Sequence, residues 1–114
     1  MEKTWTQTIL NIDKKESTCI DLVFKDPDKG HRHIQFNGKW IIEDEPNNDG
    51  ISVSVAITEK NQFFVYHDLG HDDEAHYEIF ASWEELLAKE YYDESIIDLI
   101  WNEIKDSMVE VLDI

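Results

Sequence analysis

Strict alternation between apolar residues and small or hydroxyl-bearing residues constrains the fold of this chain more than any other feature. The apolar positions are Ile51, Val53, Val55 and Ile57, each followed by a serine, an alanine or a threonine. Successive side chains of a strand point to opposite faces, so this period of two predicts a strand with one apolar face. Such a strand needs paired neighbours and a cover for that face, and the rest of the chain must supply both.

Other segments carry weaker strand signals, either alternating polarity or enrichment in β-branched and aromatic residues. They are residues 4–12, 17–25, 33–42, 62–67 and 76–80. The strongest turn signal combines Pro27 with Gly30, because proline fixes φ and glycine accepts positive φ. Residues 43–50 are the longest polar interruption, and we predict a loop there.

Helical signals are confined to the last third of the chain. Ser82 and Glu85 fit a capping box, in which the hydroxyl and the carboxylate satisfy N–H groups at a helix start, so a short helix should run to about residue 89. Residues 93–112 then place apolar side chains at helical spacing. These side chains are Ile96, Ile97, Ile100, Trp101, Ile104, Met108 and Val111.

The order of these elements, strands first and helices last, favours an α+β fold over one built from βαβ units. We predict an antiparallel sheet of five or six strands covered by C-terminal helices. A length of 114 residues supports one domain, so residues 1–114 are expected to form a single acidic α+β domain. The apolar face of residues 51–57 should contact the same core as Ile97, Ile100 and Ile104.

The chain is strongly acidic, with 26 Asp and Glu against 10 Lys and Arg and a formal charge of −16. Residues 1–57 have a net charge of −3 and residues 58–114 a net charge of −13. Direct binding to nucleic acid or anionic lipid is disfavoured, because it needs clustered basic residues. Two interpretations stay open: a solvated acidic face that aids solubility, and a negative surface that meets a positive partner.

Several classes of protein are disfavoured by what the sequence lacks. No apolar run approaches the ~18–20 residues that a membrane span needs, and the N-terminus has no signal-peptide pattern, so we expect a cytoplasmic protein of a bacterial cell. The single cysteine, Cys19, excludes an internal disulfide and is expected to be buried in a strand. No phosphate-binding glycine loop, nucleophile elbow or deaminase motif occurs, so we predict no enzyme, no catalytic residue and no cofactor.

Three imidazoles and four carboxylates fall within residues 67–76. His67, His71 and His76 could ligate zinc, nickel or copper, and the spacing of the first two would place them on one side of a helix. Gly70 and the neighbouring strand signals argue against a helix there, so the spacing loses that meaning. We predict a polar loop and no metal site, with these three histidines as the alternative.

Aromatic residues in the acidic half are the remaining candidates. Trp101 lies on the apolar stripe and is expected in the core. Tyr91 and Tyr92 lie between the two predicted helices among acidic residues, where they either anchor a protein interface or pack the helix junction. The predicted partner-binding residues are Tyr91, Tyr92, Glu94, Asp98, Glu103, Asp106 and Glu110.

The last five residues, 110–114, read Glu-Val-Leu-Asp-Ile, and residues 33–40, 55–66 and 83–86 add a basic-aromatic-glycine strand, a hairpin and a Trp-Glu-Glu-Leu segment. In these features the chain resembles the EXLDI family of small bacterial proteins over roughly residues 30–114. It lacks the ribbon-helix-helix-like N-terminal segment associated with many members. The resemblance implies a stand-alone bacterial or mobile-element domain and no catalytic residue.

Together these features predict a small acidic inhibitor that binds a basic protein. It would be either a nucleic-acid mimic of phage or plasmid origin, directed against a defence enzyme, or an immunity protein that covers a toxin. The expected partner is a nucleic-acid-processing enzyme or a toxin, with no direct contact to nucleic acid or membrane. The alternatives are a metal- or small-ligand-binding module that uses residues 67–76, and a housekeeping protein. Monomer and dimer both remain open.

Overall fold

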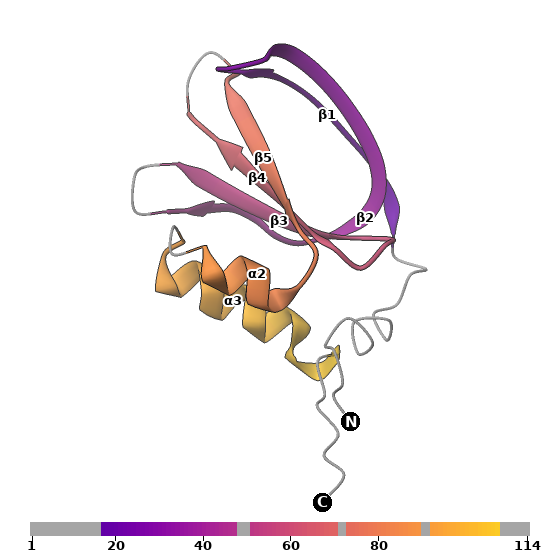
Figure 1. Ribbon diagram of the computed structural model, residues 1–114, viewed down its shortest axis with the longest axis vertical. Coiled ribbons are helices and arrows are strands. Elements are labelled where there is room, and N and C mark those ends of the chain that lie inside the picture. The colour runs from indigo at the N-terminus through magenta and orange to yellow at the C-terminus, as the bar shows by residue number, and fades with distance from the viewer. Residues whose placement is uncertain (1–16, 48–50, 71–72, 90–91, 108–114) are drawn as a thin grey trace, which may run out of the picture.

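The computed structural model describes residues 17–47, 51–70, 73–89 and 92–107. Within these residues, five strands follow one another in space as they do along the chain, each antiparallel to the next. The elements are β1 (Thr18–Asp26), β2 (Gly30–Pro46), β3 (Ser52–Thr58), β4 (Phe63–Asp68), β5 (Ala75–Phe80), α2 (Trp83–Ala88), α3 (Glu94–Ile104) and the 3-10 helix η2 (Lys105–Ser107) (Figure 1). The predicted α+β class, with an antiparallel sheet and C-terminal helices, is confirmed.

The sheet is curled rather than flat (Figure 1). At one end of the β1–β2 hairpin, the backbone N–H of Lys25 donates to the carbonyl of Asp73 at 3.0 Å, just before β5 begins. Lys25 also forms an isolated parallel bridge with Glu74. The first and last strands of the sheet therefore meet at one end, and the sheet partly closes on itself.

The long strand β2 makes this curl possible. It pairs with β1 over residues 30–38 and then with β3 over residues 38–46, with two register shifts in the second stretch. Residues 43–46, predicted as loop, continue the strand instead. Beyond Gly38, the described strands pair with only one edge of β2, which is compatible with Pro46 and with the positive φ of Asp44 (51°).

Two apolar clusters lie on opposite faces of the sheet. The helix-side core joins the sheet to α2 and α3, and its buried members are Ile42, Val53, Val55, Ile57, Phe63, Val65, Leu86, Tyr92, Ile96, Ile100 and Ile104. The concave cluster lies inside the curl, with Ile20, Ala56 and Phe64 buried and six partly buried side chains around them. The predicted contact between residues 51–57 and α3 is confirmed for Val53, Val55 and Ile57.

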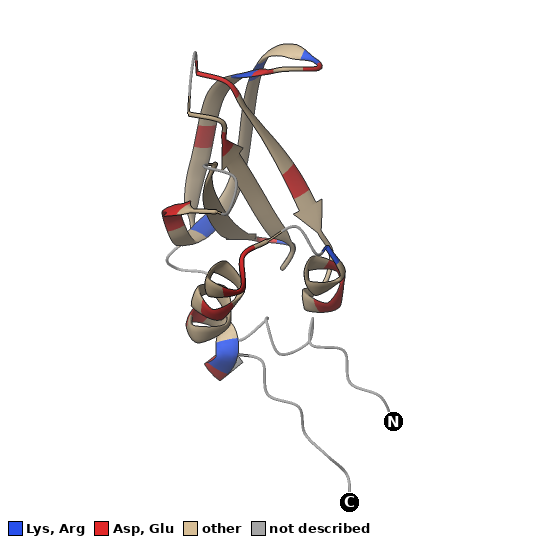
Figure 2. Ribbon diagram, turned by 90° about the vertical axis from the view of Figure 1, so that its left-hand side faces the viewer, with Lys and Arg blue, Asp and Glu red and all other residues tan. Residues whose placement is uncertain are grey.

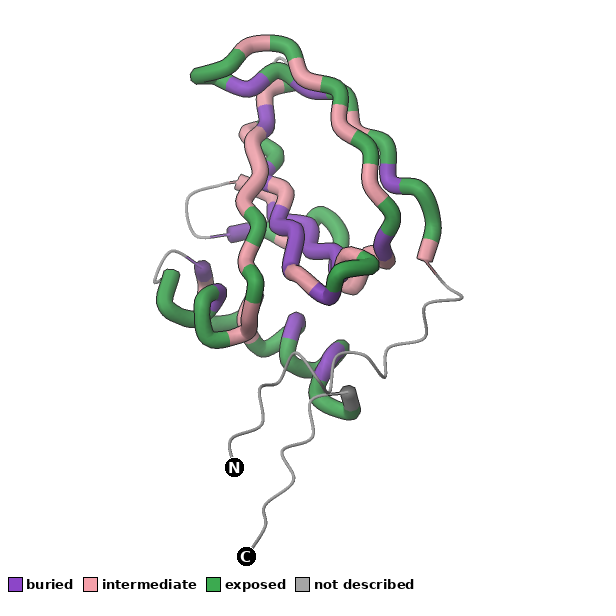
Figure 3. Tube along the Cα trace, turned by 45° about the vertical axis from the view of Figure 1, so that its right-hand side comes forward, coloured by how far each residue is buried: buried purple, intermediate pink, exposed green. Residues whose placement is uncertain are grey.

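Burial of β3 on both faces differs from the single apolar face that its alternation predicts. Ser54 and Ala56, on the second face, are also buried, and Figure 3 shows buried residues gathered in the middle strands of the sheet. The cause is the curl, because β1 and β2 turn over the far side of β3 and β4. Alternation identified the strand correctly but could not show that a later bend of the chain would cover its other face.

The helix boundaries follow local chemistry. Ser82 Oγ accepts a hydrogen bond from the Glu85 N–H at 3.1 Å, as the predicted capping box requires, whereas Glu85 Oε2 accepts one from the Ala81 N–H at 2.8 Å, one residue before the N-cap. The predicted helix over residues 93–112 is shorter in the structure, where α3 ends at Ile104 and η2 follows. Among the described residues, no helix is long and apolar enough to cross a membrane.

Four further sequence-based expectations are wrong or fall outside the described residues. Trp101 is 40% exposed rather than in the core, because it lies on the flank of the stripe formed by Ile96, Ile100 and Ile104. Cys19 is exposed because it alternates with Ile20 and points to the opposite face of β1. The strand predicted over residues 4–12 and the helical turns predicted beyond residue 107 lie outside the described part of the chain.

The turn between β1 and β2 makes stability depend on pH. Asp26 Oδ1 accepts hydrogen bonds from the N–H groups of Asp28 at 2.8 Å and Lys29 at 3.0 Å, and Gly30 follows at φ +79°. The bond from Asp28, more than any other interaction, holds the pKa of Asp26 below its usual value. A carboxylate whose pKa is lowered by folding contributes stability above its unfolded pKa, and that stability is lost as the pH falls through the folded value.

Asp26→Ala is therefore expected to destabilise the protein more at pH 7 than at pH 3. Urea unfolding of the wild type and the variant at both pH values would measure this difference. Asp28→Ala, in the same turn but with an exposed side chain, serves as the control and should show a smaller change. An Asp26→Ala effect of equal size at both pH values would contradict the proposed role of the ionised carboxylate.

Candidate functional site

Four of the seven predicted partner-binding residues lie on α3 or on η2 after it. Ile96, Ile100 and Ile104 recur every fourth position and are buried, and Ile97 packs beside them, so the exposed residues of the helix lie on its other side. Figure 2 shows acidic segments on both helices. We define the acidic helix surface as the exposed residues Glu94, Asp98, Leu99, Trp101, Glu103 and Asp106.

Trp101 is held in place although it is exposed. Its ring lies 5.8 Å, centroid to centroid, from the ring of Trp83 at the start of α2. Trp83 is itself partly buried and lies 5.9 Å from the buried ring of Phe63. A chain of three aromatic rings therefore connects the core to the solvent-exposed side of α3. An ordered, exposed tryptophan is the kind of side chain that dominates the binding energy of protein interfaces.

Apolar exposure is concentrated near the helices. Among the described residues, the exposed large apolar side chains are Val23, Ile79, Leu87, Leu99 and Trp101, and three of these five lie on α2 or α3. Apolar anchors combined with charged neighbours give both contact area and long-range attraction. The acidic helix surface combines both kinds of side chain.

Only some of the predicted partner-binding residues lie on the acidic helix surface. Glu94, Asp98, Glu103 and Asp106 are exposed, as binding to a partner would require. Tyr91 and Glu110 lie outside the described residues.

Tyr92 is not part of this surface. Its side chain is buried in the helix-side core, and its hydroxyl shares a 3.2 Å hydrogen bond with Nε2 of His67. Tyr92 therefore packs the junction between the helices, which was the second of the two interpretations for this residue. Asp93 and Asn47 hold the same junction from the other side, because the Asp93 N–H donates to Asn47 Oδ1 at 2.9 Å.

The structure brings together two of the three histidines that the sequence singled out. His67 on β4 and His76 on β5 are direct partners across the sheet, and their rings stack with centroids 4.4 Å apart. Directly after β4, Asp68 Oδ1 accepts a hydrogen bond from the Gly70 N–H at 2.8 Å, a contact typical of a polar turn. His71 lies outside the described residues.

Glu78 lies beside these two histidines, although the sequence pattern did not single it out. It stands two residues after His76 on β5, so both side chains lie on the same face of the sheet. The missed signal was the His-x-Glu spacing within a strand. Residues 76–80 were predicted as a strand, but the spacing has meaning only once that strand is known to pair with the strand of His67.

The concave side of the sheet contains a pocket of about 570 Å³. Its lining includes Ile34, Phe36, Phe64, Tyr77 and Ile79. Deeper in the curl, burial and then the charges of Asp68 and Asp73 raise the pKa of Tyr66 above its usual value, so its phenol remains neutral at physiological pH. Polar and charged side chains also line the pocket, namely Gln35, Asn37, Thr58, Glu59, Lys60 and Gln62, so apolar and polar groups share its wall.

Comparisons of the chain with protein-family models, with curated proteins and with solved structures found no match. The resemblance to the EXLDI family stays an expectation, and the five-residue motif that suggested it lies outside the described residues. Only the geometry and the charge of this chain therefore bear on its function.

Proposed function

We propose that this protein is a small acidic inhibitor that binds a basic protein through the acidic helix surface. The observation that carries the proposal is Trp101, an exposed tryptophan anchored by Trp83 and flanked by Glu94 and Asp98. The opposite side of α3 is locked into the core by three isoleucines, so these side chains are presented on a rigid support. A rigid helix face loses little conformational entropy when a partner binds it.

Charge supports a basic partner. The chain has a formal charge of −16, and residues 58–114 contribute −13 of it. Asp98 and Glu103 are exposed on α3, where self-repulsion opposes folding and a positive partner would relieve it. The proposed partner is a nucleic-acid-processing enzyme or a toxin in the cytoplasm of a bacterial cell, and the gene would belong to a phage, a plasmid or an immunity locus.

The spacing of the acidic residues favours the nucleic-acid mimic. Glu94 and Asp98 are four residues apart, which is roughly 6 Å along the helix axis. Phosphates of duplex DNA recur about every 3.4 Å along each strand, so the two carboxylates would stand in for roughly every second phosphate. An immunity protein would use the same surface to cover the basic active site of a nuclease toxin.

Photo-crosslinking identifies the partner. A photoreactive amino acid at Leu99, on the acidic helix surface, should capture a discrete basic protein in cells. The matched position is Val23 on β1, which is 74% exposed but lies away from the helices. Capture at Val23 and not at Leu99 would contradict the proposed surface.

Association with the captured partner is expected to be fast and weakened by salt. Asp98→Asn, Glu103→Gln and Asp106→Asn together should slow association by about tenfold at low salt, because electrostatic steering accelerates binding by factors of that order or more. The variant should remain folded, since like-charge repulsion is reduced. Stopped-flow association rates over a salt series measure the effect.

The matched control combines Asp28→Asn, Glu43→Gln and Asp44→Asn, which removes the same charge from exposed positions on the β1–β2 turn and on β2. It should slow association much less. Equal loss from both triple variants, or rates that do not depend on salt, would show that the charge is a solubility feature.

A further inference from the structure

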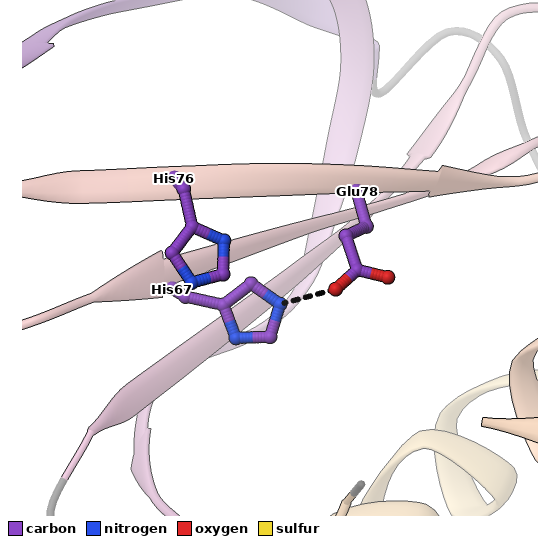
Figure 4. A group of neighbouring side chains, drawn as sticks. All are labelled: His67, His76 and Glu78. Carbon is purple, nitrogen blue, oxygen red and sulfur yellow. Dashed lines mark ion pairs between the residues drawn. The ribbon is translucent and has the colours of Figure 1, made fainter. Parts of the chain in front are cut away.

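His67, His76 and Glu78 form a compact group on the face of the sheet that the helices cover (Figure 4). One ligand atom from each residue lies within 4.8 Å of the other two. His67 faces His76 directly across the β4–β5 ladder, and Glu78 follows on the same face of β5. Two adjacent strands therefore bring three donor groups together. These strands are paired over their whole length, so they hold the groups on a rigid support.

The two oxygens of the Glu78 carboxylate lie near different neighbours. Its Oε1 lies 3.9 Å from Nε2 of His67, and its Oε2 forms a 3.2 Å ion pair with the Lys89 ammonium group at the end of α2. Lys89 thus holds one oxygen and leaves the other directed at the histidine. Outer contacts of this kind orient the ligands of metal sites in proteins.

We propose that His67, His76 and Glu78 bind a divalent transition-metal ion, with zinc as the ion that best fits the donors. Two imidazoles and one carboxylate suit zinc, copper or nickel, whereas magnesium and calcium require oxygen ligands. Tetrahedral ligands at about 2.0–2.1 Å from zinc are about 3.3–3.4 Å apart. The 3.9 Å gap between His67 and Glu78 must therefore close by roughly half an ångström.

The exposure of the three side chains permits this adjustment. His67 is fully buried and fixed, with its ring stacked on Tyr92 at 5.6 Å as well as on His76. His76 and Glu78 are only partly buried, so they can turn toward an ion that enters from solvent. The ion would take the lone pair of His67 Nε2 that the Tyr92 hydroxyl now contacts, and the phenol would give up that hydrogen bond.

Three protein ligands leave a fourth position for water or for an external group. The site is separate from the acidic helix surface, because His67 and Tyr92 lie in the interior between the sheet and the helix junction. This proposal is independent of the inhibitor proposal, and either one can fail without the other.

Zinc titration of the metal-free protein tests the site. Calorimetry measures the binding, and thermal melting measures the change in stability. One zinc ion should bind per chain and raise the melting temperature, because ligands that bind only the folded state stabilise it. Magnesium should have no such effect, which separates this site from general binding by surface carboxylates. His76→Asn with Glu78→Gln should weaken zinc binding by at least about a hundredfold, since loss of an outer-shell partner alone costs up to that factor.

The matched control is His31→Asn with His33→Asn, which removes two exposed imidazoles from β2. It should bind zinc as the wild type does. NMR of the imidazole nitrogens in the wild-type chain provides a second readout that needs no variant, and His67 and His76 should shift with zinc while His31 and His33 do not. Absence of zinc binding, equal loss in both double variants, or shifts confined to His31 and His33 would overturn the proposal.

Discussion

Replacing Phe64 by alanine is expected to lower the free energy of unfolding by about 3–5 kcal/mol, the usual cost of deleting a buried aromatic side chain. Phe64 is almost completely buried at the centre of the concave cluster. Its ring centroid lies 4.4 Å from that of Phe36 and 5.2 Å from that of Tyr77, and Trp40 approaches at 6.2 Å. Removing it leaves a cavity between strands that are distant in the sequence.

Urea unfolding measures this effect, with Val23→Ala as the control. Val23 is exposed on β1, so its truncation should change the free energy of unfolding by less than about 0.5 kcal/mol. A loss below about 1 kcal/mol for Phe64→Ala would mean that β1 and β2 do not pack over the far side of β4. The curl of the sheet would then contribute little to stability.

Ile100→Ala is expected to cost about 2–5 kcal/mol, as truncations of buried aliphatic side chains do. Ile100 lies between Ile96 and Ile104 on the buried side of α3 and contributes to the same core as Val53 and Val55.

Leu99→Ala is the matched truncation on the same helix, because Leu99 is exposed on its outer side. It should cost less than about 1 kcal/mol. Comparison of the two variants by urea unfolding separates the buried side of α3 from the exposed one. A loss below about 0.5 kcal/mol for Ile100→Ala would show that the isoleucine stripe is itself exposed and serves as an interface.

These two variants also connect stability to the proposed function. Ile100 anchors the helix that presents Trp101 and Asp98, so its truncation should weaken partner binding indirectly through loss of folded protein. Leu99→Ala should leave the fold intact and affect binding directly. Measuring both properties in both variants separates support of the surface from contact with the partner.

Much of the fold could be predicted from the sequence because it depends on short-range periodicity. The alternation through Val53 and Val55 identified β3, and the spacing of Ile96, Ile100 and Ile104 identified the buried side of α3. Ser82 and Glu85 marked the start of α2 within one residue. Each of these patterns is contained in one element, so neighbouring residues alone are enough to show it.

The candidate sites could be predicted only in part, for a related reason. Acidity in the second half of the chain indicated a charged surface, and counting residues is enough to find it. Trp101 was assigned to the core because it is apolar and near the stripe, yet a shift of about 100° around a helix places a side chain on its flank. Which flank remains open to solvent depends on where α2 packs.

Local sequence patterns thus indicated where most of the described strands and helices lie, the antiparallel pairing of the sheet and the excess of negative charge. Only the tertiary structure decided that β2 bends enough to carry Phe36 over Phe64, and that His67 meets both Glu78 and Tyr92. The physical reason is that curvature and cross-strand contact depend on register shifts and on the packing of residues far apart in the chain. Two residues that share a site through such packing, such as His67 and Tyr92, leave no periodic trace in the sequence.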